Sequence, residues 1–143
     1  MSNITPPPNG KNAFDGIAWQ RWFYSIYTFL QSVGVNGLAT PKNANGGGLV
    51  PALVVKSIGG TLFGMTGYNT GGAQFIQIHD AAAIPANGAL PVISEAISPS
   101  SGFNYDPGTL GRVFTNGIVI CSSSTLLTLT LSGSTLLIDA QYT

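Results

Sequence analysis

Apolar residues between Phe14 and Val33 recur every three or four positions, which is the spacing of an amphipathic α-helix. Asp15 suits the N-cap and Gly34 is a stop signal, so we expect a short aromatic helix over residues 14–34. The apolar positions form a seam with a second stripe beside it. The seam comprises Trp19, Trp22, Ile26, Phe29 and Val33, and the stripe comprises Phe23, Tyr27 and Leu30.

This predicted helix is unusually rich in aromatic side chains. Six of the eleven residues from Trp19 to Phe29 are aromatic, and only Arg21 among them is charged. A helix that is apolar around most of its girth must be covered on more than one side. It either fills the core of its own domain or packs against other subunits, for which the three–four spacing is the expected seam. Two heptads are short for a coiled coil, so the spacing favours the second interpretation only mildly.

The segments on either side of the predicted helix are polar. Residues 1–13 contain three consecutive prolines, which predict an extended arm that becomes ordered only against another surface. Residues 35–48 are dominated by Asn, Gly, Thr and Pro and are therefore expected to be a linker. A linker of this length would let the helix pack on a neighbouring subunit. This weakens the interpretation that the helix fills the core of its own domain.

From Leu49 onward the pattern is that of short β-strands separated by turns. Alternation is clearest in "TLLTLTLS" and "TLLIDAQYT", which Ser132-Gly133-Ser134 would join as a turn, and Asn116-Gly117 is a hairpin dipeptide. About six to eight strands predict an antiparallel sandwich or jelly-roll-like domain over residues 49–143, in a mainly β chain. The other expected strand segments are "LVPALVVKSI", "AQFIQIHD", "ALPVISEAI" and "LGRVFTNGIVICSSS".

Charged residues are scarce along the whole chain, and this affects what we expect of its surface. Charged residues make up 7 % of the sequence and the formal net charge is zero, against roughly 25 % charged residues in an ordinary domain. Edge strands of monomers are usually protected by charge, so we expect partners to cover part of this surface. The five Lys and Arg residues are scattered, which argues against a nucleic-acid partner. The aromatic run is too short to span a bilayer, so we expect no membrane partner.

Candidate catalytic residues are few. His79 beside Asp80 would need a nucleophile, and no strained G-x-S-x-G elbow is present, so a strand-end histidine with a turn-forming aspartate is the simpler interpretation. Cys121 lies in an apolar run and is expected to be a small buried hydrophobe. We therefore expect neither an enzyme nor a catalytic residue.

Metal, cofactor and phosphate sites are not indicated either. The acids of the β region have no metal-ligand spacing, and nothing singles out two of them as a glycosidase pair. "NANGGG" and "TGYNTGG" lack the lysine of a phosphate loop and are expected to be turns or linkers. "FNYDPG" could be a recognition loop, although a turn explains it equally well. The acids are Asp80, Glu95, Asp106 and Asp139.

This layout resembles the small accessory virion proteins of tailed bacteriophages. The stretch "TPPPNGKNAFDGIAWQRWFYSIYTFLQSV" is similar to the N-terminal region of phage fibre and appendage proteins, where a Pro-rich arm precedes a W-x-x-W/F-F-x-x-hydrophobic helix. The stretches "GYNTGGAQFIQIHDAAAIPANGALPV", "GRVFTNGIVICSSST" and "DAQY" are similar to small structural proteins of podoviruses and prophages. The resemblance covers most of the chain, and its motifs are structural.

The resemblance implies a non-enzymatic homo-oligomer, with a trimer favoured over a dimer, that decorates or stabilises the capsid as a cement or head-fibre protein. The expected location is the virion, with the capsid exterior favoured, after synthesis in the bacterial host cytoplasm. The expected partners are further copies of the chain and the major capsid protein or other virion proteins. The residues expected to mediate oligomerisation or docking are Trp19, Trp22, Phe23, Ile26, Phe29 and Leu30.

Two alternatives stay open. The chain could be a tail or neck adaptor that anchors a fibre. It could instead be a carbohydrate-binding module for the host surface, for which Tyr68 and Tyr105 on the β region are the available aromatic residues. Both tryptophans lie in the predicted helix, so the support for a sugar site from aromatic residues is thin.

Overall fold

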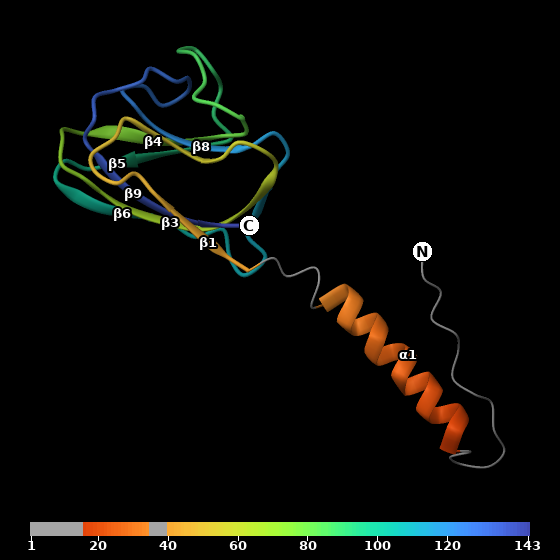
Figure 1. Cartoon of the computed structure of the whole chain (residues 1–143). Helices are drawn as coiled ribbons and strands as arrows, with labels where there is room; N and C mark the ends of the chain where they lie inside the picture. Colours follow the sequence, from red (N-terminus) through yellow and green to blue (C-terminus); the bar gives the residue numbers. More distant parts are fainter. Residues whose placement is uncertain (1–15, 35–39) are drawn as a thin grey trace. The chain divides into compact units, whose positions relative to one another are not determined.

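The computed structural model describes residues 16–34 and 40–143, and the chain divides into two compact units between Thr40 and Pro41. Helix α1 (Gly16–Gly34) belongs to the first unit, and the second unit is built from strands (Figure 1). The predicted helix is confirmed over its described length. The predicted arm over residues 1–13 and the N-cap at Asp15 lie outside the described residues.

The second unit, called here the β unit, contains two antiparallel sheets that form a sandwich-like pair of layers (Figure 1). The β9 sheet has the order β1-β9-β3-β6, with β7 also paired to β3, and the β8 sheet has the order β2-β8-β4-β5. The mainly β, sandwich-like fold is therefore confirmed, whereas a jelly roll stays a prediction. The strands are β1 (Lys42–Asn45), β2 (Ala52–Lys56), β3 (Gly60–Asn69), β4 (Gln74–His79), β5 (Ile93–Ile97), β6 (Ser101–Tyr105), β7 (Arg112–Phe114), β8 (Ile118–Ser123) and β9 (Leu136–Tyr142).

The main core lies between the two sheets and follows the strand alternation. In β9, the side chains of Leu136, Ile138 and Ala140 are buried, whereas those between them face outward. This pattern is the one expected for a half-buried strand, because successive side chains point to opposite faces. Both sheets contribute to the core, which includes Leu62, Met65, Ile76, Ile78, Ile118, Ile120, Leu136 and Ile138.

A second, smaller core lies on the outer face of the β8 sheet. Val119, Cys121 and Leu129 are fully buried there, under the loops that follow β4 and β8. The backbone of Leu129 joins the two loops: its N–H donates to the carbonyl of Ala89 at 2.8 Å, and its carbonyl accepts from Gly88 at 2.7 Å. The β8 sheet is thus covered on both faces, which leaves the outer face of the β9 sheet as the open side of the described β unit.

Buried polar side chains of the β8 sheet hold the second of these loops in place. The Nε2 group of Gln77 donates to the carbonyl oxygens of Thr125 and Leu126 at 2.8 and 3.0 Å. The hydroxyl of Ser123 donates to the carbonyl of Thr125 at 2.8 Å and accepts from the N–H of Thr130 at 3.0 Å. Buried polar groups are costly unless they are hydrogen-bonded, so these contacts fix the conformation of the loop.

The segment "TLLTLTLS" was predicted as a strand, and this prediction is wrong. Its only ladder contact is an isolated bridge between Leu131 and Ser123. Backbone groups of the segment bond instead to the side chains of Gln77, Ser123 and Asn87 and, at Leu129, to the backbone of the loop after β4. The alternation of polar and apolar residues does correspond to burial at Leu129. However, the segment finds its hydrogen-bond partners outside a strand ladder.

Three strands fall where the sequence predicted a linker, a turn or a loop, and the third is β6, which includes Phe103 and Tyr105 of "FNYDPG". Strand β1 (Lys42–Asn45) lies within the predicted linker over residues 35–48, so the β unit begins before the expected boundary at residue 49. Lys and Asn are depleted in strands, but β1 is an edge strand whose backbone pairs with β9. The "TGYN" of the predicted turn "TGYNTGG" belongs to β3. This strand contains Gly60, Gly64 and Gly67, which weaken the sequence pattern of a strand.

The hairpin expected at Asn116-Gly117 is also absent. The dipeptide does separate two short strands, but β7 pairs with β3 of one sheet and β8 pairs with β2 and β4 of the other. The connection therefore crosses between the layers. A carboxylate outside the dipeptide holds this connection, because Asp80 accepts hydrogen bonds from the backbone of Thr115, Asn116 and Gly117.

Candidate functional site: a polar face on the β9 sheet

Strand register brings four hydrogen-bonding side chains into one line across the outer face of the β9 sheet. Asn45 of β1 pairs with Asp139 of β9, Asp139 pairs with Thr66 of β3, and Thr66 pairs with Asn104 of β6. We call these four residues the polar row. Since neighbouring strands lie about 4.8 Å apart, the row spans roughly 14 Å. It is flanked by a second polar pair, Asn43 and Gln141, in the next register position along β1 and β9.

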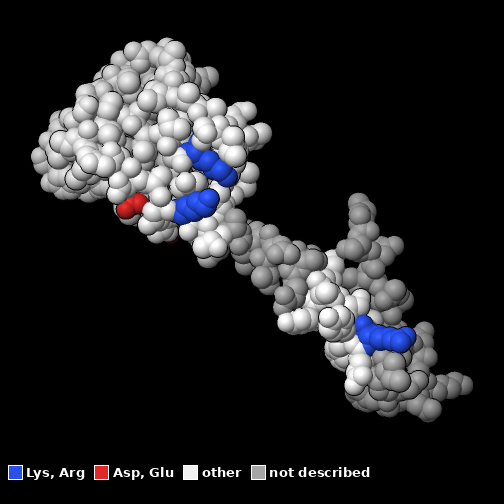
Figure 2. All heavy atoms as spheres, viewed as in Figure 1, with Lys and Arg blue, Asp and Glu red and all other residues white. Residues whose placement is uncertain are grey.

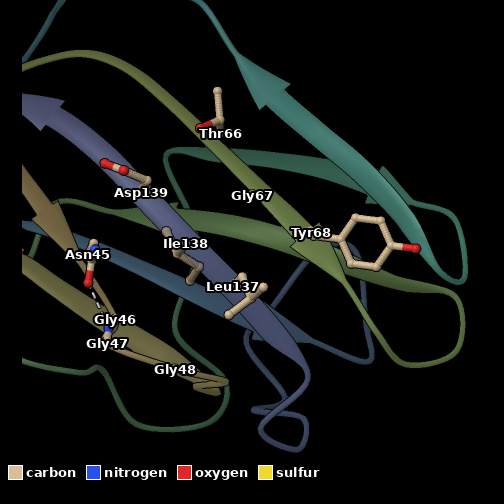
Figure 3. Close-up of a pocket in the computed structure, with 10 residues that line it drawn as sticks. All are labelled: Asn45, Gly46, Gly47, Gly48, Thr66, Gly67, Tyr68, Leu137, Ile138 and Asp139. Carbon is tan, nitrogen blue, oxygen red and sulfur yellow. Dashed lines mark hydrogen bonds between the residues drawn. The ribbon is translucent and has the colours of Figure 1, made fainter.

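Two adjoining clefts lie over the polar row. The larger has a volume of about 580 Å³ and is lined by Asn45, Tyr68 and Asp139, among others (Figure 3). The smaller has a volume of about 330 Å³ and extends to Asn104 and Gln141. Thr66 and Asp139 line both clefts, so the clefts meet at the middle of the row. These volumes are in the range of small-ligand sites.

Three consecutive glycines form one wall of the larger cleft. The Oδ1 atom of Asn45 accepts a hydrogen bond from the N–H of Gly47 at 2.8 Å, which leaves the side-chain nitrogen pointing away from the loop (Figure 3). Gly47 has a φ of 66°, a left-handed conformation that glycine adopts without steric cost. The N–H of Gly46 donates to the carbonyl of Ile138 at 3.1 Å, which ties this wall to β9.

Two aromatic rings, both on β3, lie on either side of the polar row along that strand. Leu62 and Met65 both face the core, so the bulge in β3 between them places an extra residue, Phe63, on the outer side, where it lines the smaller cleft. Tyr68 lines the larger cleft and is 42 % exposed. Its hydroxyl donates to the carbonyl of Ser100 at 2.8 Å, which holds the ring in position.

The clefts are acidic and contain no cationic lining residue. Their charged lining residues are Asp139, at the centre of the polar row, and Asp106, in the smaller cleft. Asp106 also accepts a hydrogen bond from the N–H of Gly108 at 2.7 Å and so belongs to a turn. Figure 2 shows that charged side chains are sparse over the visible surface of the β unit.

The residues named from sequence fall partly on this face. Tyr68 lies on it, whereas Tyr105 packs against the core and contributes to the wall of the smaller cleft. Of the four acids, Asp106 and Asp139 line the clefts, Glu95 lies in β5 of the other sheet, and Asp80 holds the loop before β8. The polar row itself was missed because β1, β3 and β6 were not recognised as strands. The alternation of apolar and polar residues in β9 was the available signal, because it places Asp139 on the outward face.

His79 and Asp80 have separate structural environments. His79 is only 2 % exposed, and within residues 40–143 its Nε2 atom has no hydrogen-bond partner. Burial lowers the pKa of His79, and a hydrogen bond to the backbone of Leu90 partly offsets this effect. The pKa of Asp80 is lowered chiefly by the N–H of Asn116 and also by the other N–H groups that it binds, while burial opposes the shift. Asp80 therefore holds the loop before β8, and burial favours the neutral form of His79.

Cys121 is buried in the smaller core, as predicted. Burial raises the pKa of its thiol to about 12, so the thiolate that reacts with oxidants or metals is disfavoured. Over the described chain, no three His, Cys, Asp or Glu side chains are grouped as metal ligands would be. In residues 16–34 and 40–143, no helix combines the length and the hydropathy needed to cross a membrane.

Helix α1 carries the predicted aromatic side chains. The rings of Trp19, Trp22 and Phe23 cluster, with centroid distances of 5.1 to 5.8 Å. Phe23 and Tyr27 of the second stripe are 54 % and 59 % exposed. In the seam, Trp19, Trp22, Ile26 and Phe29 are half-buried, and the side chain of Leu30 lies outside the described residues.

Comparisons of the chain with protein-family models, with curated proteins and with solved structures find no match.

Proposed function

We propose that this protein is a non-enzymatic structural protein of a bacteriophage virion, which decorates or stabilises the capsid as a homo-oligomer. The observation that carries the proposal is the exposed aromatic stripe of α1, in which Phe23 and Tyr27 are more than half exposed. The assembly element is α1, and its partner is α1 of another copy of the chain. A trimer is favoured because the phage proteins that the sequence resembles often form trimers.

The energetics of the helix support assembly. Each buried aromatic side chain covers about 150–250 Å². Because Phe23 and Tyr27 are about half exposed, burial of the exposed part of one ring, at about 25 cal/mol per Å², contributes roughly 2–3 kcal/mol before entropy is considered. Contiguous apolar surface of this kind is uncommon on monomers and is typical of interaction sites. The three–four spacing of the seam favours a neighbouring helix as the cover.

Low charge and exposed apolar side chains on the β unit support contacts with further virion proteins. Leu90 and Leu127, on the two loops that cover the β8 sheet, are 77 % and 76 % exposed. Together with a net charge of zero, this surface is poorly suited to a dispersed monomer. The major capsid protein is the proposed partner of this surface.

The proposed oligomer is tested by light scattering on a sizing column. We expect the full chain to elute as a defined oligomer and the double variant Trp22→Ser/Phe29→Ser to elute as a monomer. Tyr24→Ser is the matched control, because Tyr24 is a 70 % exposed aromatic of the same helix that lies outside both the seam and the stripe. The control should keep the mass of the unchanged chain.

Circular dichroism of the same samples separates assembly from folding. The double variant should retain the β signal, since the β unit is a separate compact unit. A monomeric full chain, or loss of the β signal in the double variant, would contradict the proposed role of α1. The virion location is tested separately by immunogold labelling of particles from cells that express the chain. Label on tails instead of capsids would favour the alternative of a tail or neck adaptor.

A further inference from the structure

We propose that the polar face of the β9 sheet binds a neutral oligosaccharide along the polar row. The juxtaposition that carries this inference is a line of amide, carboxylate and hydroxyl groups, from Asn45 to Asn104, between the aromatic rings of Phe63 and Tyr68. The inference is independent of the proposed function, because it rests on the outer face of the β9 sheet, whereas that function rests on α1 and on the loops over the β8 sheet.

The hydrogen-bonding groups of the row match the chemistry of sugar hydroxyls. A sugar hydroxyl both donates and accepts, so it is best held by groups of both kinds. The Asp139 carboxylate can only accept, whereas the amides of Asn45 and Asn104 and the hydroxyl of Thr66 can donate. Because Asp139 lies at the meeting point of the two clefts, it can accept from hydroxyls of a ligand that occupies either.

The flanking rings match the other face of a sugar. A pyranose ring presents a face of C–H groups, which packs against an aromatic side chain as apolar surfaces do. Tyr68 is held by its hydrogen bond to Ser100, so little side-chain entropy is lost when a ligand packs on it. On the other side of the row, the β3 bulge supplies Phe63, although strict alternation would have turned one of residues 63 and 64 into the core.

The charge of the clefts selects a neutral ligand. Recognition of phosphate, sulfate or a sugar acid generally uses Arg or Lys, and the lining residues include neither. The carboxylates of Asp139 and Asp106 would repel such anions. A protein segment is a less suitable occupant because the middle of the face, at Thr66 and Asp139, is polar, whereas the centre of a protein interface is apolar. The outer glycine wall, at Gly47 and Gly48, has open space beside it, which leaves room for a ligand.

The test is binding of the full chain to a glycan array that carries neutral, sialylated and sulfated oligosaccharides. We expect binding to neutral glycans only, and chelator in the buffer should not reduce it. Calorimetry with the best neutral glycan should then show that Asp139→Ala and Tyr68→Ala each weaken binding by about tenfold or more. Glu95→Gln, which changes an exposed carboxylate in the other sheet, should bind as the unchanged chain does.

Two further variants keep the test clear of folding effects. Asp139→Asn preserves the shape of the side chain and removes the charge, and Thr66→Val removes only the hydroxyl from the middle of the row. Both should weaken binding while thermal unfolding stays close to that of the unchanged chain. Binding to no neutral glycan, preference for anionic glycans, or equal affinity of all face variants would overturn the proposal. None of these results would bear on the oligomeric state.

Discussion

Phe103 of β6 lies directly opposite Gly67 of β3, with its ring in the space that a side chain at residue 67 would occupy. A Cβ atom at residue 67 would overlap this ring and also the carbonyl oxygen of Leu137. The glycine at residue 67 of β3 is therefore required by the close approach of its neighbours. It also allows Phe103 to cover the strand backbone from the core side.

Replacing Gly67 with alanine should destabilise the β unit by about 1–3 kcal/mol, because backbone and ring must both shift to admit one methyl group. Urea unfolding followed by circular dichroism measures this change. Gly72→Ala is the matched control, since nothing lies within 4 Å of a Cβ atom there, and its effect should stay within about 0.5 kcal/mol. Equal stability of the two variants would show that the β3–β6 contact is looser than described.

Stability should fall as the pH decreases from about 7.5 to 5.5, because of His79. Burial lowers its folded-state pKa below the usual 6.5, so below pH 6.5 the unfolded chain binds a proton that the folded chain does not. His79 is the only histidine of the sequence, so His79→Gln should flatten this part of the stability profile. Urea midpoints measured across this pH range provide the test. A profile that is unchanged by His79→Gln would contradict this assignment.

Asp80 should stabilise the fold at pH values above the pKa that it has in the unfolded chain, and this stabilisation should disappear in acid. Its folded pKa is lowered by the N–H groups that it binds, chiefly that of Asn116, so stability is lost as the pH falls from about 3.8 through the lower folded value. At pH 7, Asp80→Asn should unfold at lower urea than the unchanged chain. The difference between the two curves should shrink as the pH falls below about 3.8. A constant difference between them at all pH values would indicate a steric cause instead.

Cys121 should resist thiol reagents in the folded protein. The side chain is fully buried, and its pKa is raised to about 12, so almost no thiolate exists at pH 8. We expect labelling by iodoacetamide to proceed only through unfolding, and its rate to rise steeply with urea. Rapid labelling at zero urea, at the rate of a free peptide thiol, would mean that the loops over the smaller core open easily.

Much of the fold could be predicted because its pattern is local. The alternation of Leu136, Ile138 and Ala140 identified β9, and the three–four spacing identified α1. The strands that were missed are those whose sequence conflicts with strand propensity. Strand β1 is polar because it is an edge strand. Strand β3 is rich in glycine because the ring of Phe103 lies against Gly67 and the carbonyl oxygen of Thr143 lies against Gly60. Both facts depend on neighbouring strands that single-sequence patterns do not identify.

The candidate site was harder to predict than the fold. Asn45, Thr66, Asn104 and Asp139 are spread over almost a hundred residues, and only the register of four strands brings them into line. Asp139 was noticed as an acid, but nothing in its own segment distinguished it from Glu95 on the other sheet. Likewise, "TLLTLTLS" alternates as a strand does, yet the amide of Gln77 satisfies its backbone from outside the segment.

The position of β9 in its sheet has a consequence for biosynthesis. It is the last strand along the chain, yet it lies between β1 and β3, which are among the first. On the ribosome, β1 and β3 must therefore wait, without their shared partner, until residues 136–142 emerge. The β8 sheet can pair earlier, since its last strand ends at Ser123. The polar face would thus be the last part of the β unit to take shape, and an incomplete nascent chain would lack it altogether.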